Sequence, residues 1–229
     1  MTNSLFDLPF DAFDNIIKYS GGLRVLGLLG ASVVNKSLRA KFMNFLSSQV
    51  FDFTDNILVS NSFATFVIER NVSLVSKSIK CKPDIDPSLL FRFLSTVSHL
   101  QSIDLSGYKK FSELSLTDAF SCIRALNLSN CYQLTDACMH RVLNRCSTLL
   151  YLNLSDCIQL TDATICRVAE CCSALTSLNL YQCSKVSDFS VCRVAMQCSS
   201  LRSLNLYQCL QITDTSAIRL SQVGSSVLA

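Results

Sequence analysis

A period of 26 residues runs through the C-terminal half of the chain and constrains its fold more than any other feature. Rows written from Ile123, Leu149, Leu175 and Leu201 align at almost every position and open with an apolar residue followed by x-x-L-x-L-x-x-C. The aligned columns are Leu126, Leu152, Leu178 and Leu204; Leu128, Leu154, Leu180 and Leu206; and Cys131, Cys157, Cys183 and Cys209. A unit this short cannot bury its apolar face alone, so we expect successive units to stack.

Each row predicts one strand followed by one helix. In Leu126-Asn127-Leu128 the apolar residues alternate, so both leucines face inward and Asn127 faces the other side. Met139, Val142, Leu143 and Cys146 recur at helical spacing. The rows therefore predict an α/β solenoid with parallel strands on a concave face and helices on a convex face.

A hydroxyl residue followed by aspartate stands between each strand and its helix. The four pairs are Thr135-Asp136, Thr161-Asp162, Ser187-Asp188 and Thr213-Asp214. We expect the hydroxyl to cap the helix and the carboxylate to face the positive end of the helix dipole. No acid or base partner recurs beside them, so capping is favoured over catalysis.

The chain has thirteen cysteines, two histidines and no Cys-x-x-Cys pair. Without a basic, apolar start to the chain, we expect a cytoplasmic and/or nuclear protein with free thiols. The Cys131 column is expected to pack and to donate weak hydrogen bonds to loop carbonyls, and Cys146, Cys172 and Cys198 to pack at the helix ends. Cys166, Cys171 and Cys192 lie off these columns and are expected to be the more exposed thiols. We expect no metal and no cofactor.

Composition excludes several classes of function. Twenty basic against 17 acidic side chains leave a formal charge of +3, which is too small for a surface that follows nucleic-acid phosphates. The longest apolar run, residues 25–34, is interrupted by Gly27, Gly30 and Ser32, so no membrane span is expected. No glycine-rich phosphate loop, G-x-S-x-G turn or His-Glu metal motif occurs, so we do not expect an enzyme.

The four rows of residues 123–229 resemble leucine-rich repeats of the cysteine-containing subfamily. A shorter row of 23 residues, 100–122, carries Leu100, Ile103 and Leu105, with Tyr108 in the cysteine position. Residues 47–99 are interpreted as degenerate repeats, with strands at 51–53 and 80–81, a cap at 85–86 and a helix at 88–97. The resemblance implies a leucine-rich-repeat solenoid over residues 47–229.

Residues 1–46 do not share the period and predict a small helical module. Leu8-Pro9, Asp11, Ile16, Tyr19 and Val34-Asn35-Lys36 are similar to the F-box motif. That resemblance implies that the module binds a Skp-type adaptor, and through it a cullin ligase, by Leu8, Pro9, Ile16, Ile17 and Val34. The alternative is a helical cap that only covers the open end of the solenoid.

An F-box-like module followed by such repeats is the arrangement of F-box leucine-rich-repeat proteins. The resemblance implies a non-catalytic substrate receptor of a Skp-cullin-F-box ubiquitin ligase, which holds a protein substrate for ubiquitination. The alternative is an interaction or inhibitor protein that acts outside any ligase, in cell-cycle or signalling control.

Substrate contacts are expected from strand residues that point away from the core. They are Asp104, Asn127, Tyr151, Asn153, Asn179, Tyr181, Asn205 and Tyr207, with Ser129 and Ser155 beside them. Tyr181 and Tyr207 share a column, so their rings should be neighbours and good binding anchors. The asparagine column either contacts a partner's backbone or forms mutually hydrogen-bonded amides.

Two further features are left with alternatives. Arg141, Arg167, Arg193 and Arg219 form a column on the helix side that either recruits an acidic partner or is solvated surface. At the C-terminus Gly224 falls in a cysteine column and Val227 would begin another strand. We therefore expect an uncapped sheet edge there, open to edge-to-edge association. Either the chain is a truncated product or fragment, or a partner or second copy covers this edge.

Overall fold

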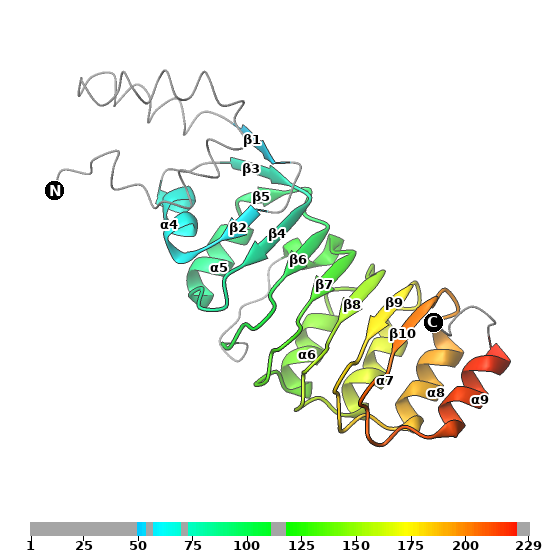
Figure 1. Ribbon diagram of the computed structural model, residues 1–229. Helices are drawn as coiled ribbons and strands as arrows, with labels where there is room; N and C mark the ends of the chain where they lie inside the picture. Colours follow the sequence, from blue (N-terminus) through cyan, green and yellow to red (C-terminus); the bar gives the residue numbers. More distant parts are fainter. Residues whose placement is uncertain (1–49, 54–56, 70–72, 111–117, 224–229) are drawn as a thin grey trace, which may run out of the picture.

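The computed structural model describes residues 50–53, 57–69, 73–110 and 118–223 (Figure 1). The F-box-like module, with Leu8, Pro9, Ile16, Ile17 and Val34, lies outside the described residues, as do Gly224 and Val227.

A seven-stranded parallel sheet forms one face of the molecule. Its order is β10-β9-β8-β7-β6-β4-β2, so each row adds one strand beside the previous one. The strands are β2 (Ile57–Val59), β4 (Ser78–Cys81), β6 (Ser102–Asp104), β7 (Ala125–Asn127), β8 (Tyr151–Asn153), β9 (Ser177–Asn179) and β10 (Ser203–Asn205). Leu126 pairs with Leu152, and Leu178 with Leu204, which confirms that residues 26 apart lie side by side.

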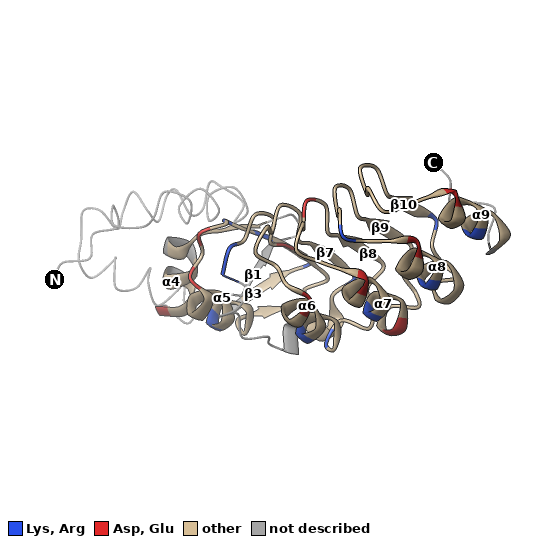
Figure 2. Ribbon diagram, turned by 90° about the horizontal axis from the view of Figure 1, so that it is seen from below, with Lys and Arg blue, Asp and Glu red and all other residues tan. Residues whose placement is uncertain are grey.

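Helices pack against the opposite side of this sheet (Figures 1 and 2). In the regular rows they are α6 (Asp136–Leu143), α7 (Asp162–Cys171), α8 (Asp188–Gln197) and α9 (Asp214–Val223), and in the preceding rows α4 (Asn61–Glu69) and α5 (Pro87–Leu94). The predicted alternation of strand and helix is therefore confirmed, and the described part of the chain is a stacked solenoid of leucine-rich-repeat type. Below, its two sides are called the sheet face and the helix face.

The core lies between sheet and helices and is continuous from row to row. Leu126, Leu152 and Leu178 are buried, and Met139 and Val142 of α6 belong to the same buried cluster from the helix side. Leu204 of the last described strand is 9% exposed and Leu206 is only partly buried, because no further row covers them in the described residues. Each row thus depends on its neighbour for part of its burial.

The hydroxyl-aspartate pairs do more than the predicted capping. The Thr135 hydroxyl accepts from the Cys138 N–H, and the Thr161 hydroxyl from the Ala163 N–H, as helix N-caps do. The Asp136 carboxylate, however, accepts from the next row: from the Thr161 N–H at 3.0 Å, from the Thr161 hydroxyl at 2.8 Å and from the Thr164 hydroxyl. Asp162 and Asp188 repeat this bridge one and two rows later. Their donors are Ser187 and Ser190 for Asp162, and Thr213 and Ser216 for Asp188.

The N-terminal rows differ from the expected degenerate repeats. Strand β1 (Val50–Phe53) confirms the predicted strand at 51–53, but it pairs with β3 (Ser73–Ser76) in a separate parallel sheet that ends with β5 (Val97–Ser98). The helix predicted over 88–97 ends at Leu94, because the chain turns there into β5. Strand β4 and the Asp86 cap of α5 agree with the prediction for this segment.

The short row 100–122 interrupts the line of helices. Tyr108 is buried in the cysteine position, as its alignment suggested. Where the regular rows have an α-helix, this row has a 3-10 helix, η3 (Asp118–Cys122).

Candidate protein-binding surface

The cysteine column fixes the turns on which the candidate surface is built. Each thiol donates to a main-chain carbonyl of the preceding row, for example from Cys157 to Leu128 O at 3.1 Å and from Cys183 to Leu154 O at 3.2 Å. The predicted packing role with a weak donor is therefore confirmed. Burial raises the pKa of the Cys183 thiol to about 12, so this column is a set of inert thiols.

Each of the five rows with strands β6 to β10 turns sharply after its strand through one residue in the left-handed conformation. These residues are Gly107, Asn130, Asp156, Gln182 and Gln208, with φ between 58° and 72°. Gly107, with the largest φ of 72°, is the one glycine among the five, and glycine adopts this conformation without steric cost. The residues that follow this turn therefore lie along the carboxyl edge of the sheet, which is the edge where the strands end.

The asparagine column supports these turns instead of forming a ladder between rows. Asn127 Oδ1 accepts from the Ser129 N–H at 3.1 Å, and Asn179 Oδ1 from the Tyr181 N–H at 3.0 Å; Asp104, Asn153 and Asn205 do the same in their rows. Among the described residues these amides do not bond one another, so the predicted mutual ladder is wrong. The carbonyl oxygen is used locally, which leaves the amide nitrogen as the group that can bind a partner.

The charge on the sheet face lies at its N-terminal end. Lys80 Nζ lies 3.2 Å from Asp104 Oδ2. Burial would raise the pKa of Asp104, but hydrogen bonds from Ser106 and the neighbouring Lys80 outweigh it, so the pKa is lowered. Asp104, predicted as a contact residue, is thus an ionised member of an ion pair, and the face beyond it presents uncharged asparagines and tyrosines.

The tyrosine pair lies where the column predicted it. The rings of Tyr181 and Tyr207 stack with centroids 5.8 Å apart and planes 11° apart. Tyr207 is 68% exposed, while Tyr181 is half-buried and its hydroxyl accepts from Gln182 Nε2 at 3.1 Å. Tyr151, also predicted as a contact, is exposed at the start of β8 and therefore lies at the other end of the strands from this pair.

Sequence reasoning missed three exposed apolar residues on the same edge as the tyrosine pair. Tyr132, Ile158 and Leu210 follow the cysteine column directly and are 54%, 41% and 82% exposed. We call Tyr132, Ile158, Tyr181, Tyr207 and Leu210 the carboxyl rim. The signal in the sequence was a large apolar residue in a turn column where packing requires none.

Two predicted contact serines are buried. Ser129 and Ser155 are each 8% exposed, although they share the column of Tyr181 and Tyr207. Small side chains fold under the turn in the earlier rows, whereas the tyrosines are too large to do so and extend over the edge. Residues of this column are therefore buried in the rows of Ser129 and Ser155 and become part of the surface in the rows of Tyr181 and Tyr207.

The arginine column on the helix face is partly paired. Arg167 and Arg193 both contact the carboxylate of Glu170, at 3.1 and 3.4 Å. Arg219 donates to the Met196 sulfur and to the Gln222 side chain. Exposed pairs of this kind contribute little to stability.

The three off-column thiols are more exposed than the buried column thiols, as expected, but the sequence did not predict the exposed thiol of the short row. Cys166, Cys171 and Cys192 are half-buried, whereas Cys122, at the end of η3, is exposed. Burial raises the pKa of Cys166. Cys122 was missed because the irregular short row has no helix period from which exposure could be inferred.

The described residues contain neither a membrane-spanning helix nor a cluster of metal ligands. None of their helices is long and apolar enough to cross a membrane. In the same residues no group of three or more His, Cys, Asp or Glu side chains is placed to hold a metal ion.

Comparison with known proteins gives only distant likenesses, all of them to solved structures. No family model matches the chain, and no curated protein matches it. Among solved structures, the chain is similar to one in the crystal structure of the Rad7 and Elc1 complex in yeast, with a TM-score of 0.38 and 14% identity, over 96% of this chain and 85% of that chain. The functional proposal therefore depends on the residues of this chain rather than on that likeness.

Proposed function

We propose that the chain is a non-catalytic substrate receptor of a Skp-cullin-F-box ubiquitin ligase, acting in the cytoplasm and/or nucleus. The observation that carries the binding role is the carboxyl rim: a stacked tyrosine pair with exposed apolar neighbours beside a face of uncharged amides. Exposed aromatic anchors surrounded by polar groups are typical of protein-protein contacts.

A polypeptide is the substrate class that suits this surface. Strands about 4.8 Å apart present equivalent side chains in long rows, which matches an extended chain better than a small molecule. The described strands themselves also offer little to a phosphate backbone, because the one cation within them, Lys80, is already paired with Asp104.

The ligase role comes from the F-box resemblance of residues 1–46. Leu8, Pro9, Ile16, Ile17 and Val34 are the proposed contacts with the Skp-type adaptor, which joins the receptor to the cullin. The receptor then raises the rate of ubiquitin transfer by holding substrate close to the active site of another subunit.

Adaptor capture by the full-length chain tests the ligase role. We expect the wild type to capture a Skp-type adaptor in a pull-down and the Leu8→Ala/Ile16→Ala double variant to lose it. The Tyr181→Ala/Tyr207→Ala double variant is the matched control and should keep it. If the wild type captures no adaptor, the ligase role is rejected and a binding protein outside any ligase is the remaining function.

Proximity labelling in cells tests the binding surface separately. A Tyr207→Ala/Leu210→Ser variant should lose a set of proteins that the wild type labels. Phe189→Ala removes a ring of similar exposure from the helix face and should keep that set. Identical sets for all three proteins would remove the carboxyl rim from the proposal.

A further inference from the structure

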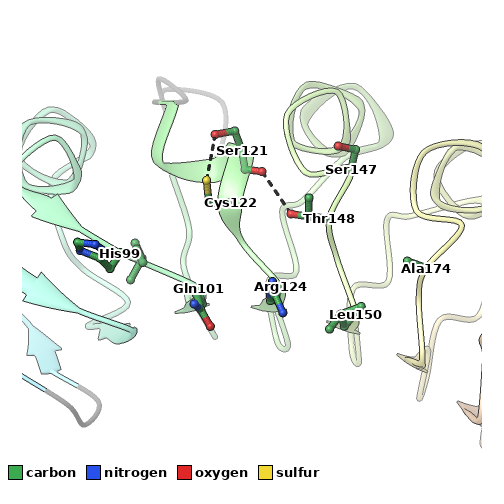
Figure 3. A pocket seen from close by; sticks show the side chains of 10 residues that line it. His99, Gln101, Ser121, Cys122, Arg124, Ser147, Thr148, Leu150 and Ala174 are labelled. Atoms are coloured by element: carbon green, nitrogen blue, oxygen red, sulfur yellow. Dashed lines mark hydrogen bonds between the residues drawn. The ribbon is translucent and has the colours of Figure 1, made fainter.

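An open groove lies along the opposite edge of the sheet, where the chain enters each strand (Figure 3). It has a volume of about 640 Å³ and draws residues from four successive rows, among them His99, Gln101, Cys122, Arg124, Thr148 and Ala174. We call it the amino groove. It is separate from the carboxyl rim, because the strands run between the two edges.

Hydrogen bonds between rows hold the wall of the amino groove. The Thr148 hydroxyl donates to Ile123 O at 2.9 Å and to Ser121 O at 3.2 Å. The residue that precedes each strand also donates its main-chain N–H to the equivalent residue of the previous row. Arg124 donates to Gln101 O at 2.7 Å, and Leu150 donates to Arg124 O at 2.8 Å. The groove is therefore a fixed feature of the sheet edge, and a ligand need not order it.

Three of the six residues in the column at this edge are cations. It comprises Lys77, Gln101, Arg124, Leu150, Thr176 and Arg202, joined by the same kind of main-chain bond. Lys77, Arg124 and Arg202 are exposed, and none of them has an ion pair within the part of the chain that the structure describes. No carboxylate stands among the described residues that line the groove.

We propose that the amino groove binds an extended acidic segment of a partner protein. Five steps of about 4.8 Å separate Lys77 from Arg202, a span of about 24 Å that an extended peptide covers in about seven residues. Arg124 lies near the middle of this span and lines the groove, whereas Lys77 and Arg202 lie on the same edge beyond the two ends of the groove. Carboxylates spaced along the peptide can pair with the three cations, while its backbone meets the exposed Gln101 and Ser147 side chains.

A single-stranded nucleic acid suits the amino groove less well. Such ligands bind where bases stack on aromatic side chains along a basic groove. His99 is the sole ring among the described lining residues, and Arg124 is the sole permanent cation. We therefore assign the groove to a peptide and use nucleic acid as a competitor.

Fluorescence anisotropy on the full chain tests the proposal with a labelled nine-residue peptide in which Asp alternates with Leu. We expect saturable binding that weakens at least tenfold in Arg124→Glu and also weakens in Ser147→Tyr, which fills the groove without changing its charge. Arg219→Glu reverses another exposed charge, on the helix face, and should change affinity less than twofold. Thermal melts followed by circular dichroism confirm that each variant is folded.

Three results would overturn the proposal. They are equal affinity for a peptide with Ser in place of Asp, equal weakening by Arg219→Glu and Arg124→Glu, and displacement of the peptide by an oligothymidine at lower concentration than by unlabelled peptide. None of these measurements involves the adaptor or the tyrosine pair, so the result is independent of the proposed ligase role.

Discussion

Asp136, Asp162 and Asp188 show how one residue type connects two rows. Each carboxylate accepts three hydrogen bonds from the following row, one from a main-chain N–H and two from hydroxyls. One residue of each donor set also caps the next helix, namely Thr161, Ser187 or Thr213, so this column links each strand-to-helix turn to the next. We therefore expect each aspartate to stabilise the following row more than the helix in which it lies.

Asp162→Ala should lower the free energy of unfolding by about 2 kcal/mol, because three donors of the next row lose a charged acceptor. Asp214→Ala is the matched control, since no further row follows Asp214 in the described residues; it should cost less than about 0.5 kcal/mol. Urea unfolding followed by circular dichroism measures both. Equal costs would show that the bridge contributes nothing beyond the local cap.

Alkylation should separate the thiols by exposure. Burial raises the pKa of Cys131 and Cys183 to about 12, so at pH 8 only about one in ten thousand of these thiols is ionised. We expect iodoacetamide to modify exposed Cys122 first and to leave the two buried thiols intact in the folded protein. Mass spectrometry of tryptic peptides measures the order, and early modification of Cys183 would contradict it.

At the scale of elements, the helix starts explain the acid response of the solenoid. Burial would raise the pKa of Asp136, but hydrogen bonds from Thr164 and Thr161 outweigh it and lower the pKa; those from Ser216 and Thr213 lower the pKa of Asp188. A carboxyl group with a lower pKa in the folded state stabilises the fold above its unfolded pKa. That stability is lost as pH falls through the folded pKa.

Stability should therefore be nearly constant from pH 7 to about 5 and should decline below about pH 4, the ordinary range of aspartate. The Asp136→Asn/Asp188→Asn variant should be less stable at neutral pH and should show a shallower decline. Urea midpoints between pH 7 and pH 3 measure both slopes. A variant with the same decline as the wild type would assign the acid response to other carboxylates.

At the scale of the whole molecule, protection should follow the stacking of rows. The Leu128, Leu154 and Leu180 N–H groups each donate to a carbonyl of the following row, at 2.8 to 2.9 Å. Leu206 holds the same position in the last described strand and has no such acceptor among the described residues. The described sheet therefore ends in an edge at which the Leu206 amide lacks the inter-row hydrogen bond that the equivalent internal amides make.

Hydrogen exchange should be at least tenfold faster at Leu206 than at Leu154, because Leu206 lacks an inter-row bond. Exchange measured by nuclear magnetic resonance on dilute full-length protein provides the comparison. Equal protection would contradict the open edge. Protection of Leu206 that rises with protein concentration would support the edge-to-edge association expected from the sequence.

The period determined which residues meet across rows, and this was available from the sequence alone. Parallel strands in register place residues 26 apart side by side. The leucine core, the thiol column and the neighbouring rings of Tyr181 and Tyr207 all follow from that one fact. The helix caps were equally accessible, because a hydroxyl before a helical stripe has a local role that needs no knowledge of the fold.

Only the tertiary structure decided the features that depend on the backbone conformation between the aligned residues of a row. The Asn127 oxygen accepts from its own main chain, and Tyr132 is exposed after the left-handed turn at Asn130; neither direction follows from spacing. The Asp136 bridge needs the offset between successive turns, and the amino groove needs the irregular row with η3 beside regular ones. A repeat pattern specifies lateral neighbours, whereas side-chain direction at a turn is set by backbone dihedral angles that packing of the whole array selects.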